Sequence, residues 1–184
     1  MNILIPLAEG FEEIEAVTVI DVLRRGGLDV LVAGVGAREI KGAHGLIIMA
    51  DVEIGQTVQN KFAGIFLPGG LPGSENLLHC QELRAMLLSQ HKEDRWLGAI
   101  CAAPMVLGDL GILAGRRATC YPGFEDKLGG AIFSEDRVVV DGTIITARGA
   151  GVSLEFSFRI LDALGFTIAA NKLRKGMLAD ASAG

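Results

Sequence analysis

Residues 2–33 have the sequence NILIPLAEGFEEIEAVTVIDVLRRGGLDVLVA, in which a helical pattern separates two short apolar runs. The runs at 2–7 and 28–33 are rich in Ile, Leu and Val, which is typical of buried strands. The segment 12–25 between them is amphipathic, and a glycine pair ends it. Its apolar residues recur every three positions: Ile14, Val17, Ile20 and Leu23. The stretch therefore predicts a strand, a helix and a second strand.

The rest of the chain alternates in the same way. Further strands are expected at 46–50, 64–67 and 96–100, and helices at 105–110, 152–164 and 168–178. Ser74 is the expected N-cap of another helix that includes Leu77 and Leu87. The segments 137–140 and 143–147 flank Asp141-Gly142, which predicts a hairpin with a type I′ turn. We expect a single domain over residues 1–184, an α/β sandwich with a mostly parallel sheet.

Composition excludes several classes of protein. The 184 residues are 50% hydrophobic and carry 17 Lys and Arg against 22 Asp and Glu, a net charge of -5. Disorder is therefore excluded, and the absence of a basic run argues against a nucleic-acid partner. The longest uncharged stretches, 62–74 and 96–108, contain Gly and Pro and are shorter than the ~20 residues of a membrane helix. The N-terminus lacks the positive flank of a secretory signal, so we expect a cytoplasmic protein without a membrane partner.

Cys101 is the first candidate for chemistry. It lies in AICAAP, between the strand 96–100 and a helix, where free N–H groups and the helix dipole would lower the pKa of its thiol. By itself, a cysteine in apolar surroundings is more often an inert core residue. Cys80 and Cys120 lack this context and are interpreted as structural. An odd number of cysteines without a CxxC spacing argues against disulfides and against a metal site.

The turn PGG at 68–70 follows a neighbouring predicted strand. Glycine allows the backbone to approach a reacting atom, so the N–H groups of Gly70 and Ala102 are candidates for an oxyanion hole beside Cys101. The alternative is that this glycine-rich segment is only a tight turn.

Glu15 is the third candidate. Glu12 and Glu13 are interpreted as ordinary acids of a helix N-terminus. Glu15, in contrast, shares a helix face with Thr18 and Val22 that can point into the crevice at the strand ends. An apolar crevice would raise its pKa and let it share a proton with the thiolate. The alternative is a solvated helix acid.

These three elements, in this order, resemble the ThiJ/PfpI superfamily and in particular its DJ-one-like branch. The resemblance extends from NILIPLAEGFEEIEAV through IFLPGG and AICAAP to ITARGAGVSLEF. It implies a three-layer α/β/α sandwich of the flavodoxin-like and class I glutamine amidotransferase-like kind. It also implies that Cys101 is the reactive residue, that Glu15 hydrogen-bonds to it, and that Gly70 and Ala102 supply the oxyanion donors.

The resemblance further implies a homodimer with Arg25 and His44 of the partner near the site. For these two residues the alternatives are a solvated charge and a loop residue. Gly69 and Tyr121 are expected in the substrate pocket. Tyr121 stands where some relatives carry His, and Ala102 where peptidase-like relatives carry His, so a Cys-His-acid triad is absent. Both differences argue against proteolysis.

The function that follows is a cofactor-independent glyoxalase or deglycase. It would act on small α-oxoaldehydes such as methylglyoxal, or on their protein adducts, without metal or glutathione. One alternative is an oxidative-stress sensor in which peroxide oxidises Cys101, because thiolate character governs both reactions. A chaperone or binding role is the third possibility.

Overall fold

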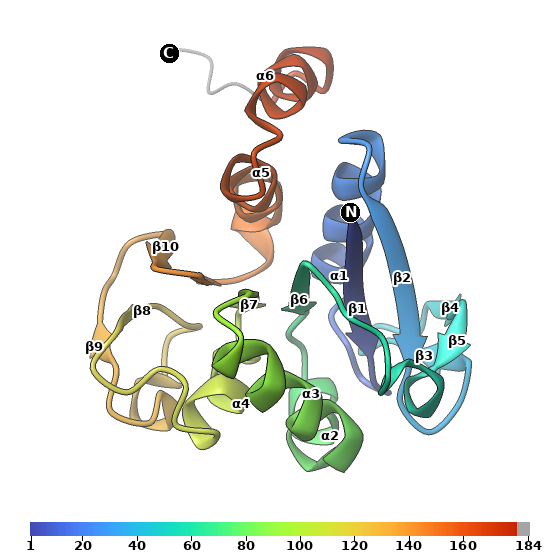
Figure 1. Ribbon diagram of the computed structural model, residues 1–184, viewed down its shortest axis with the longest axis vertical. Coiled ribbons are helices and arrows are strands. Elements are labelled where there is room, and N and C mark those ends of the chain that lie inside the picture. Colours follow the sequence, from blue (N-terminus) through green and yellow to red (C-terminus); the bar gives the residue numbers. More distant parts are fainter. Residues whose placement is uncertain (180–184) are drawn as a thin grey trace.

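The computed structural model describes residues 1–179, which form a seven-stranded central sheet (Figure 1). Six of its strands run parallel, and only β10 is antiparallel to its neighbour β11. In spatial order the strands are β10 (Val138–Asp141), β11 (Ile144–Ala147), β7 (Trp96–Ile100), β6 (Gly64–Leu67), β1 (Asn2–Leu7), β2 (Asp29–Gly34) and β5 (Val52–Glu53).

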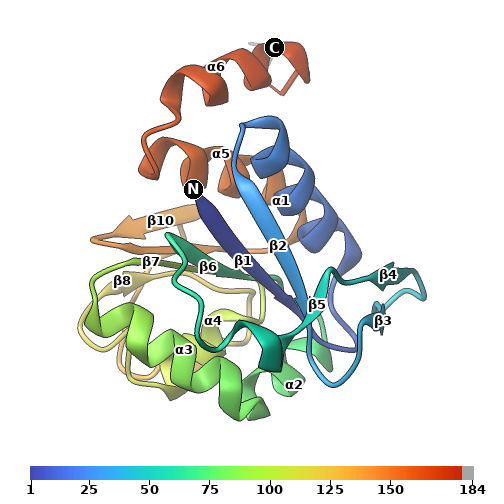
Figure 2. The same cartoon turned by 45° about the vertical axis from the view of Figure 1, so that its right-hand side comes forward.

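Helices cover both faces of this sheet, as Figure 2 shows. On one face lie α1 (Glu13–Arg25) and α5 (Ser153–Ala163), with α6 (Thr167–Gly176) packed against α5. On the other face lie α2 (Gly73–His79), α3 (Gln81–Lys92) and α4 (Pro104–Asp109). The fold is therefore the α/β sandwich that the sequence predicted.

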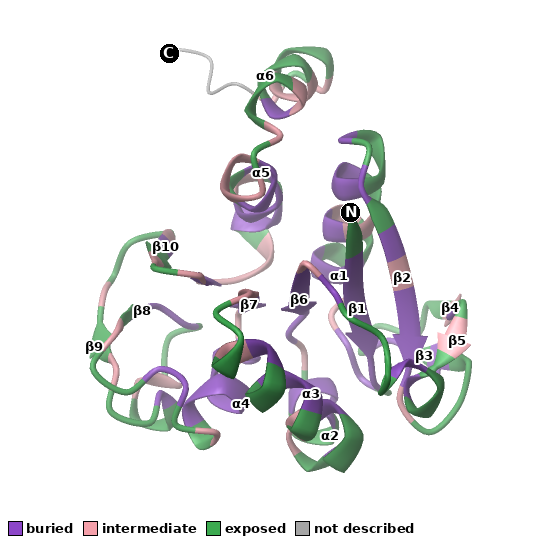
Figure 3. Ribbon diagram, in the orientation of Figure 1, coloured by how far each residue is buried: buried purple, intermediate pink, exposed green. Residues whose placement is uncertain are grey.

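Strand alternation divides the interior into two apolar cores. In β1, Ile3, Ile5 and Leu7 join the core under α1 and α5, whereas Leu4 joins the core under α2, α3 and α4. Figure 3 shows that the central strands are buried along most of their length. Because both faces are covered, the strands are continuously apolar, as is expected of parallel sheets.

Smaller elements surround the sheet. The strands β3 (Glu39–Lys41) and β4 (Ile47–Met49) form a separate hairpin, so the strand expected at 46–50 does not belong to the central sheet. The parallel pair β8 (Arg117–Ala118) and β9 (Ile132–Phe133) is also separate. Three short 3-10 helices complete the fold: η1 (Ile54–Thr57), η2 (Glu125–Lys127) and η3 (Ala150–Val152).

Two local predictions were wrong. Ser74 is not an N-cap: it is buried inside the first turn of α2, and extended backbone at Cys80 separates α2 from α3. In the β10–β11 hairpin, Asp141 pairs with Ile144, so the loop is Gly142–Thr143. Only Gly142 of these two has a positive φ, 58°, whereas a type I′ turn needs two such residues.

The helix α1 was expected to be amphipathic with an apolar residue at every third position. Leu23 is buried as expected, but the other buried apolar residues of α1 are Ala16, Val19 and Val22, because this face meets the sheet and α5. Ile14 and Val17 are 58% and 47% exposed. Across the described part of the chain, every helix is too short or too polar to span a bilayer.

Candidate active site at the carboxyl ends of the strands

Four adjacent parallel strands, β1, β6, β7 and β11, end at the same edge of the sheet. Backbone hydrogen bonds join the segments that follow them. The N–H of Glu12 donates to the carbonyl of Gly69 at 2.9 Å, and the N–H of Cys101 donates to the carbonyl of Ala147 at 2.9 Å. The ends of parallel strands are where α/β proteins place their ligand sites.

Cys101 occupies a sharp bend directly after β7. Its φ is 64°, a left-handed conformation that costs a residue with a side chain about 1–3 kcal/mol. Hydrogen bonds hold it there, because its N–H is bound by β11 and its carbonyl accepts the N–H of Tyr121 at 2.8 Å. The residue is half-buried, and α4 begins three residues later at Pro104. The bend therefore holds the thiol at the site, as in a nucleophile elbow.

The Glu15 side chain lies beneath this bend and is fully buried. Its Oε2 accepts the N–H of Gly69 at 2.7 Å. Its Oε1 has no hydrogen bond of ordinary geometry to any residue that the structure describes. Sγ of Cys101 lies close enough that hydrogen bonding between thiol and carboxyl affects both pKa values. One carboxyl oxygen is thus left for proton exchange with the sulfur.

Burial raises the pKa values of both groups. Burial raises the pKa of Glu15 to about 7. Burial, followed by the charge of Glu15 and its hydrogen bond, raises the pKa of Cys101 to about 12. Between these values the pair holds a single proton that the two groups share. The expectation of a lowered thiol pKa was wrong, because burial and then the buried carboxylate beside the sulfur raise the pKa of Cys101.

Two backbone N–H groups partly offset the rise in the Cys101 pKa. The N–H groups of Ala102 and Gly70 donate hydrogen bonds to the Cys101 sulfur and lower its pKa. Gly70 has a φ of 90°, and a Cβ on it would collide with the backbone nitrogen of Glu12. Because both N–H groups point at the sulfur, they can also donate to an oxygen on a carbon bonded to it. The structure thus brings Cys101, Glu15, Gly70 and Ala102 together.

Tyr121 and Gly149 lie on the outer side of the sulfur. Tyr121 is 50% exposed, and its backbone is bound to Cys101. A Cβ built on Gly149 would lie 3.3 Å from the Tyr121 ring and 3.9 Å from Sγ. The sequence analysis did not include Gly149. Its position in ARGAG, directly after a strand, was the available signal, but such a pattern is equally typical of a turn.

Arg25 and His44 are not part of this group within one chain. Arg25 ends α1 and pairs with Asp21 at 2.6 Å. His44 lies in the loop of the β3–β4 hairpin, where its Nδ1 is 2.8 Å from a carboxylate oxygen of Glu13. Both residues are exposed. A role for them in a partner's site stays a prediction.

Glu13 is not the ordinary helix acid that the sequence indicated. It is buried, and it accepts the N–H groups of His44 at 2.7 Å and Leu46 at 3.4 Å. Together, Glu12, Glu13 and His44 present ligand atoms within 4.8 Å of one another, and this is the one such group among residues 1–179. A carboxylate and imidazole set of this kind can coordinate Zn²⁺. Hydrogen bonds already occupy the Glu13 oxygens, and the expectation of a metal-free protein stays a prediction.

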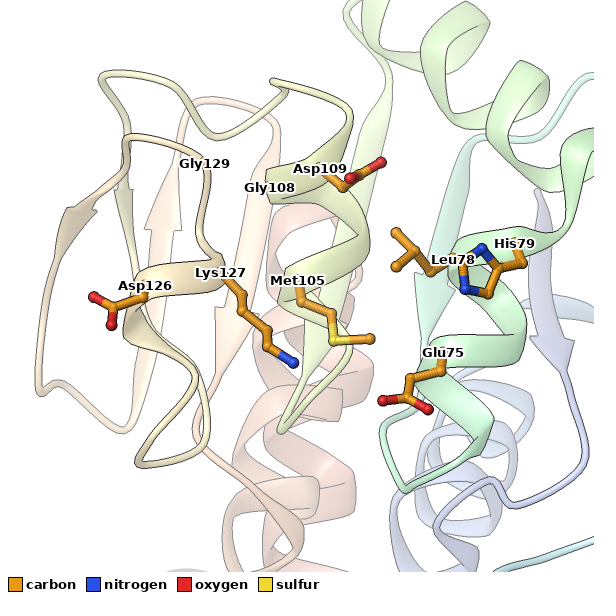
Figure 4. A pocket seen from close by; sticks show the side chains of 9 residues that line it. All are labelled: Glu75, Leu78, His79, Met105, Gly108, Asp109, Asp126, Lys127 and Gly129. Atoms are coloured by element: carbon orange, nitrogen blue, oxygen red, sulfur yellow. The ribbon is translucent and has the colours of Figure 1, made fainter.

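A cavity of about 410 Å³ lies on the face of the sheet that is opposite α1 and α5, between α2, α4 and η2 (Figure 4). Its floor is apolar, with Leu78 and Met105, and its rim carries acidic groups and Lys127. Neither Cys101 nor Glu15 lines it. The cavity is therefore separate from the site at the strand ends. Its lining residues are Glu75, Leu78, His79, Met105, Gly108, Asp109, Asp126, Lys127 and Gly129.

The chain is similar to several known proteins. It is 45% identical over 166 residues to "Protein DJ-1 homolog B" of Arabidopsis thaliana, covering 89% of this chain but 38% of that protein. The chain thus spans about two fifths of the length of the plant relatives it matches. It is 39% identical to "Glutathione-independent glyoxalase DJR-1.2" of Caenorhabditis elegans, covering 94% and 92% of the two chains.

Solved structures agree with this likeness. The structure "Toxoplasma gondii DJ-1, oxidized" superposes with a TM-score of 0.93 at 34% identity and covers 96% of this chain and 97% of that one. The model of the DJ-1/PfpI family matches residues 1–163. The chain belongs to the DJ-1/PfpI family.

Proposed function

We propose that this protein is a glutathione-independent glyoxalase or deglycase that acts on small α-oxoaldehydes or on their adducts. The observation that carries the proposal is the buried Glu15 carboxyl, which hydrogen-bonds with Cys101 beside two N–H donors. A similar protein of Caenorhabditis elegans bears the name of this activity. Tyr121 and Gly69 would border the substrate.

The first half of the reaction forms a hemithioacetal. When Glu15 holds the shared proton, the sulfur of Cys101 is a thiolate and attacks the aldehyde carbon. The π electrons of the carbonyl move to its oxygen, which the N–H groups of Gly70 and Ala102 stabilise. The oxygen then takes the proton of Glu15. The carboxylate that remains is ready to act as a base.

The second half moves hydrogen between adjacent carbons. Glu15 removes the proton of the former aldehyde carbon, and the electron pair moves onto the second carbonyl oxygen to give an enediolate. Glu15 then returns the proton to the neighbouring carbon, while the hydroxyl proton of the first carbon passes to the oxygen of the second. The product is a thioester of a 2-hydroxy acid, which water hydrolyses to release the acid and restore the thiol. One carbon is oxidised and its neighbour is reduced. The sequence of steps therefore consumes one water and needs no external oxidant, metal or glutathione.

The test is conversion of methylglyoxal to lactate by the purified chain. Cys101→Ser and Glu15→Gln should each abolish it, because one removes the nucleophile and the other the only group that moves the proton. Circular dichroism and thermal melting would establish that both variants fold. Full activity in either folded variant would exclude the mechanism.

Oxidation of Cys101 is the second candidate, favoured by the half-buried position of the residue and by the similarity to the oxidized DJ-1 of Toxoplasma gondii. Two molecules of hydrogen peroxide would each transfer an oxygen to sulfur and leave water, giving the sulfinate. Mass spectrometry after mild peroxide measures this as +32 Da. Selective oxidation of Cys101 together with negligible turnover would favour the sensor over the enzyme.

We also propose that the protein is a homodimer, as the resemblance implies. Exposed apolar side chains on α1 and on the β3–β4 hairpin support this, and hydrogen bonds hold the hairpin against the start of α1. Val17→Asp should shift the dimer to monomer in analytical ultracentrifugation, and an unchanged mass would exclude this surface. Its exposed apolar residues are Ile14, Val17, Leu46, Ile47 and Met49.

A further inference from the structure

Five residues border the sulfur of Cys101, and they differ in exposure. Glu15 and Ala102 are buried, and the half-buried Gly70 packs tightly against the backbone of residues 10–12, which follow β1. On the remaining side, Tyr121 is exposed and Gly149 is half-buried, with no backbone packed over the space between them and the sulfur. A substrate therefore reaches the sulfur past these two residues.

Gly149 leaves room that any other residue would fill. Its φ of 164° and ψ of -173° are extended backbone, which every residue adopts without strain. Space, not conformation, thus distinguishes glycine here. A methyl group on Gly149 would stand in van der Waals contact with Sγ and slightly too close to the Tyr121 ring. The space between the ring, the Gly149 backbone and the sulfur is therefore about the size of one small substituent.

In the reaction proposed above, the stereochemistry of the hemithioacetal determines which part of the substrate occupies that space. In the hemithioacetal, the former aldehyde carbon carries sulfur, oxygen, hydrogen and the second carbonyl carbon. The oxygen faces Gly70 and Ala102, and the hydrogen must face Glu15, which removes it. Only the side toward Gly149 and Tyr121 is left for the second carbon and its substituent.

We propose that Gly149 and Tyr121 determine which α-oxoaldehydes this protein accepts. They form a slot that admits hydrogen or methyl as the substituent and rejects branched and aryl groups. This inference rests on the proposed function for its substrate class. The slot itself is a feature of access to Cys101 and can be measured without turnover.

The experiment compares Gly149→Ala with Gly151→Ala in the full chain. A Cβ on Gly151 meets nothing within 4 Å, so this variant carries the same substitution two residues away as a matched control. Gly149→Ala should lower kcat/KM for methylglyoxal by roughly tenfold or more, the usual effect of one methyl group in a closed pocket. Gly151→Ala should behave as the wild type.

Tyr121→Ala is the converse variant. Removing the ring should raise the ratio of kcat/KM for phenylglyoxal to that for methylglyoxal by roughly tenfold. An unchanged ratio would overturn the assignment of Tyr121. Equal kinetics of Gly149→Ala and Gly151→Ala with methylglyoxal would overturn that of Gly149.

Thiol labelling separates the slot from the enzymatic activity. Rates of Cys101 modification by iodoacetamide and by the bulkier N-phenylmaleimide are followed by mass spectrometry. Gly149→Ala should slow the maleimide more than iodoacetamide, and Tyr121→Ala should speed the maleimide selectively. If these selectivities hold in a protein that converts no α-oxoaldehyde, the slot is supported and the proposed function fails. If they are absent, the slot is overturned whatever the turnover.

Discussion

Glu13 and Glu15 lie two residues apart on α1, and both are buried, yet their pKa values move in opposite directions. The pKa of Glu15 rises to about 7, whereas that of Glu13 falls below its usual value. Burial acts to raise both. The pKa of Glu13 nevertheless falls, because the side chain and backbone of His44 and the N–H of Leu46 donate hydrogen bonds to its carboxylate. Glu15 accepts one backbone N–H, from Gly69, and its carboxyl group hydrogen-bonds with the thiol of Cys101.

The comparison shows that the supply of donors, together with burial, decides what a buried carboxylate does. Glu13 is fully provided with donors by the β3–β4 loop and acts as a structural anion. Glu15 lacks donors and therefore retains a proton near neutral pH, which suits a group that moves protons. One helix turn thus carries both a structural acid and a candidate catalytic acid.

The largest expected difference is in turnover. Glu15→Gln should lower kcat/KM for methylglyoxal by about 100-fold or more, because the amide keeps the hydrogen bond from Gly69 but cannot exchange a proton. Glu13→Gln should lower it by less than about 10-fold, since Glu13 faces the hairpin and not the sulfur. Steady-state kinetics on both variants measures the contrast. Similar losses would mean that Glu15 has no special role in proton transfer.

The next effect is the pH dependence of stability. Between its ordinary pKa of 4.5 and about 7, Glu15 keeps a proton in the folded state that the unfolded chain releases. Its contribution to the free energy of unfolding is therefore present below pH 4.5 and is lost, by about 3 kcal/mol, as pH rises through 7. In urea titrations, the free energy of unfolding of Glu15→Gln should therefore rise relative to that of the wild type by about 3 kcal/mol between pH 4.5 and pH 8.

Glu13 should show the opposite sign. Its lowered pKa stabilises the fold above pH 4.5, and this contribution disappears as pH falls through the pKa of the folded state. Glu13→Gln should therefore have a lower free energy of unfolding than the wild type at pH 7, and this difference should shrink in acid. A difference that grows in acid would show that the hydrogen bonds from the hairpin loop do not hold the carboxylate.

A smaller effect is expected from truncation at neutral pH. Glu13→Ala leaves two backbone N–H groups and the His44 ring without their acceptor, which should cost about 2 kcal/mol of unfolding free energy. Glu75→Ala, which removes an exposed acid in the first turn of α2, should change it by less than about 0.5 kcal/mol. Equal effects in denaturant titrations would contradict the structural role of Glu13.

The smallest expected effect is on the pKa of one residue, His44. The hydrogen bond to Glu13 raises the pKa of His44, so its contribution to stability is present below the ordinary pKa and is lost as pH rises through the raised one. In NMR titrations, Glu13→Gln should return the His44 pKa toward 6.5, while Glu15→Gln should leave it unchanged. An unaltered His44 pKa in Glu13→Gln would place the cause elsewhere.

Several elements could be predicted from the sequence because their signals are local. The strands at 2–7, 64–67 and 96–100 have the predicted bounds, since short continuous runs of apolar residues between turns are typical of buried strands. Cys101 was recognisable from its place between such a run and a helix. The order of the motifs along the chain also identified the family, which the comparison with known proteins confirms.

Other features depend on contacts between distant segments. The exposure of Ile14 and Val17 depends on which face of α1 meets α5. The donors that hold Glu13 come from a hairpin some thirty residues further along the chain, and none of its residues signals this contact by type. The direction in which the Cys101 pKa shifts depends on burial and on a carboxylate, both of which only the fold brings to the sulfur.

The sequence by itself determined the order of strands and helices and the choice of Cys101 as the candidate nucleophile, because both follow from the periodicity and residue types of short segments. Only the tertiary structure decided the protonation of Glu15 and Cys101, the structural role of Glu13 and the slot beside Gly149. These properties arise from burial and from distances between segments that lie far apart in the chain. No local pattern of residues carries that information.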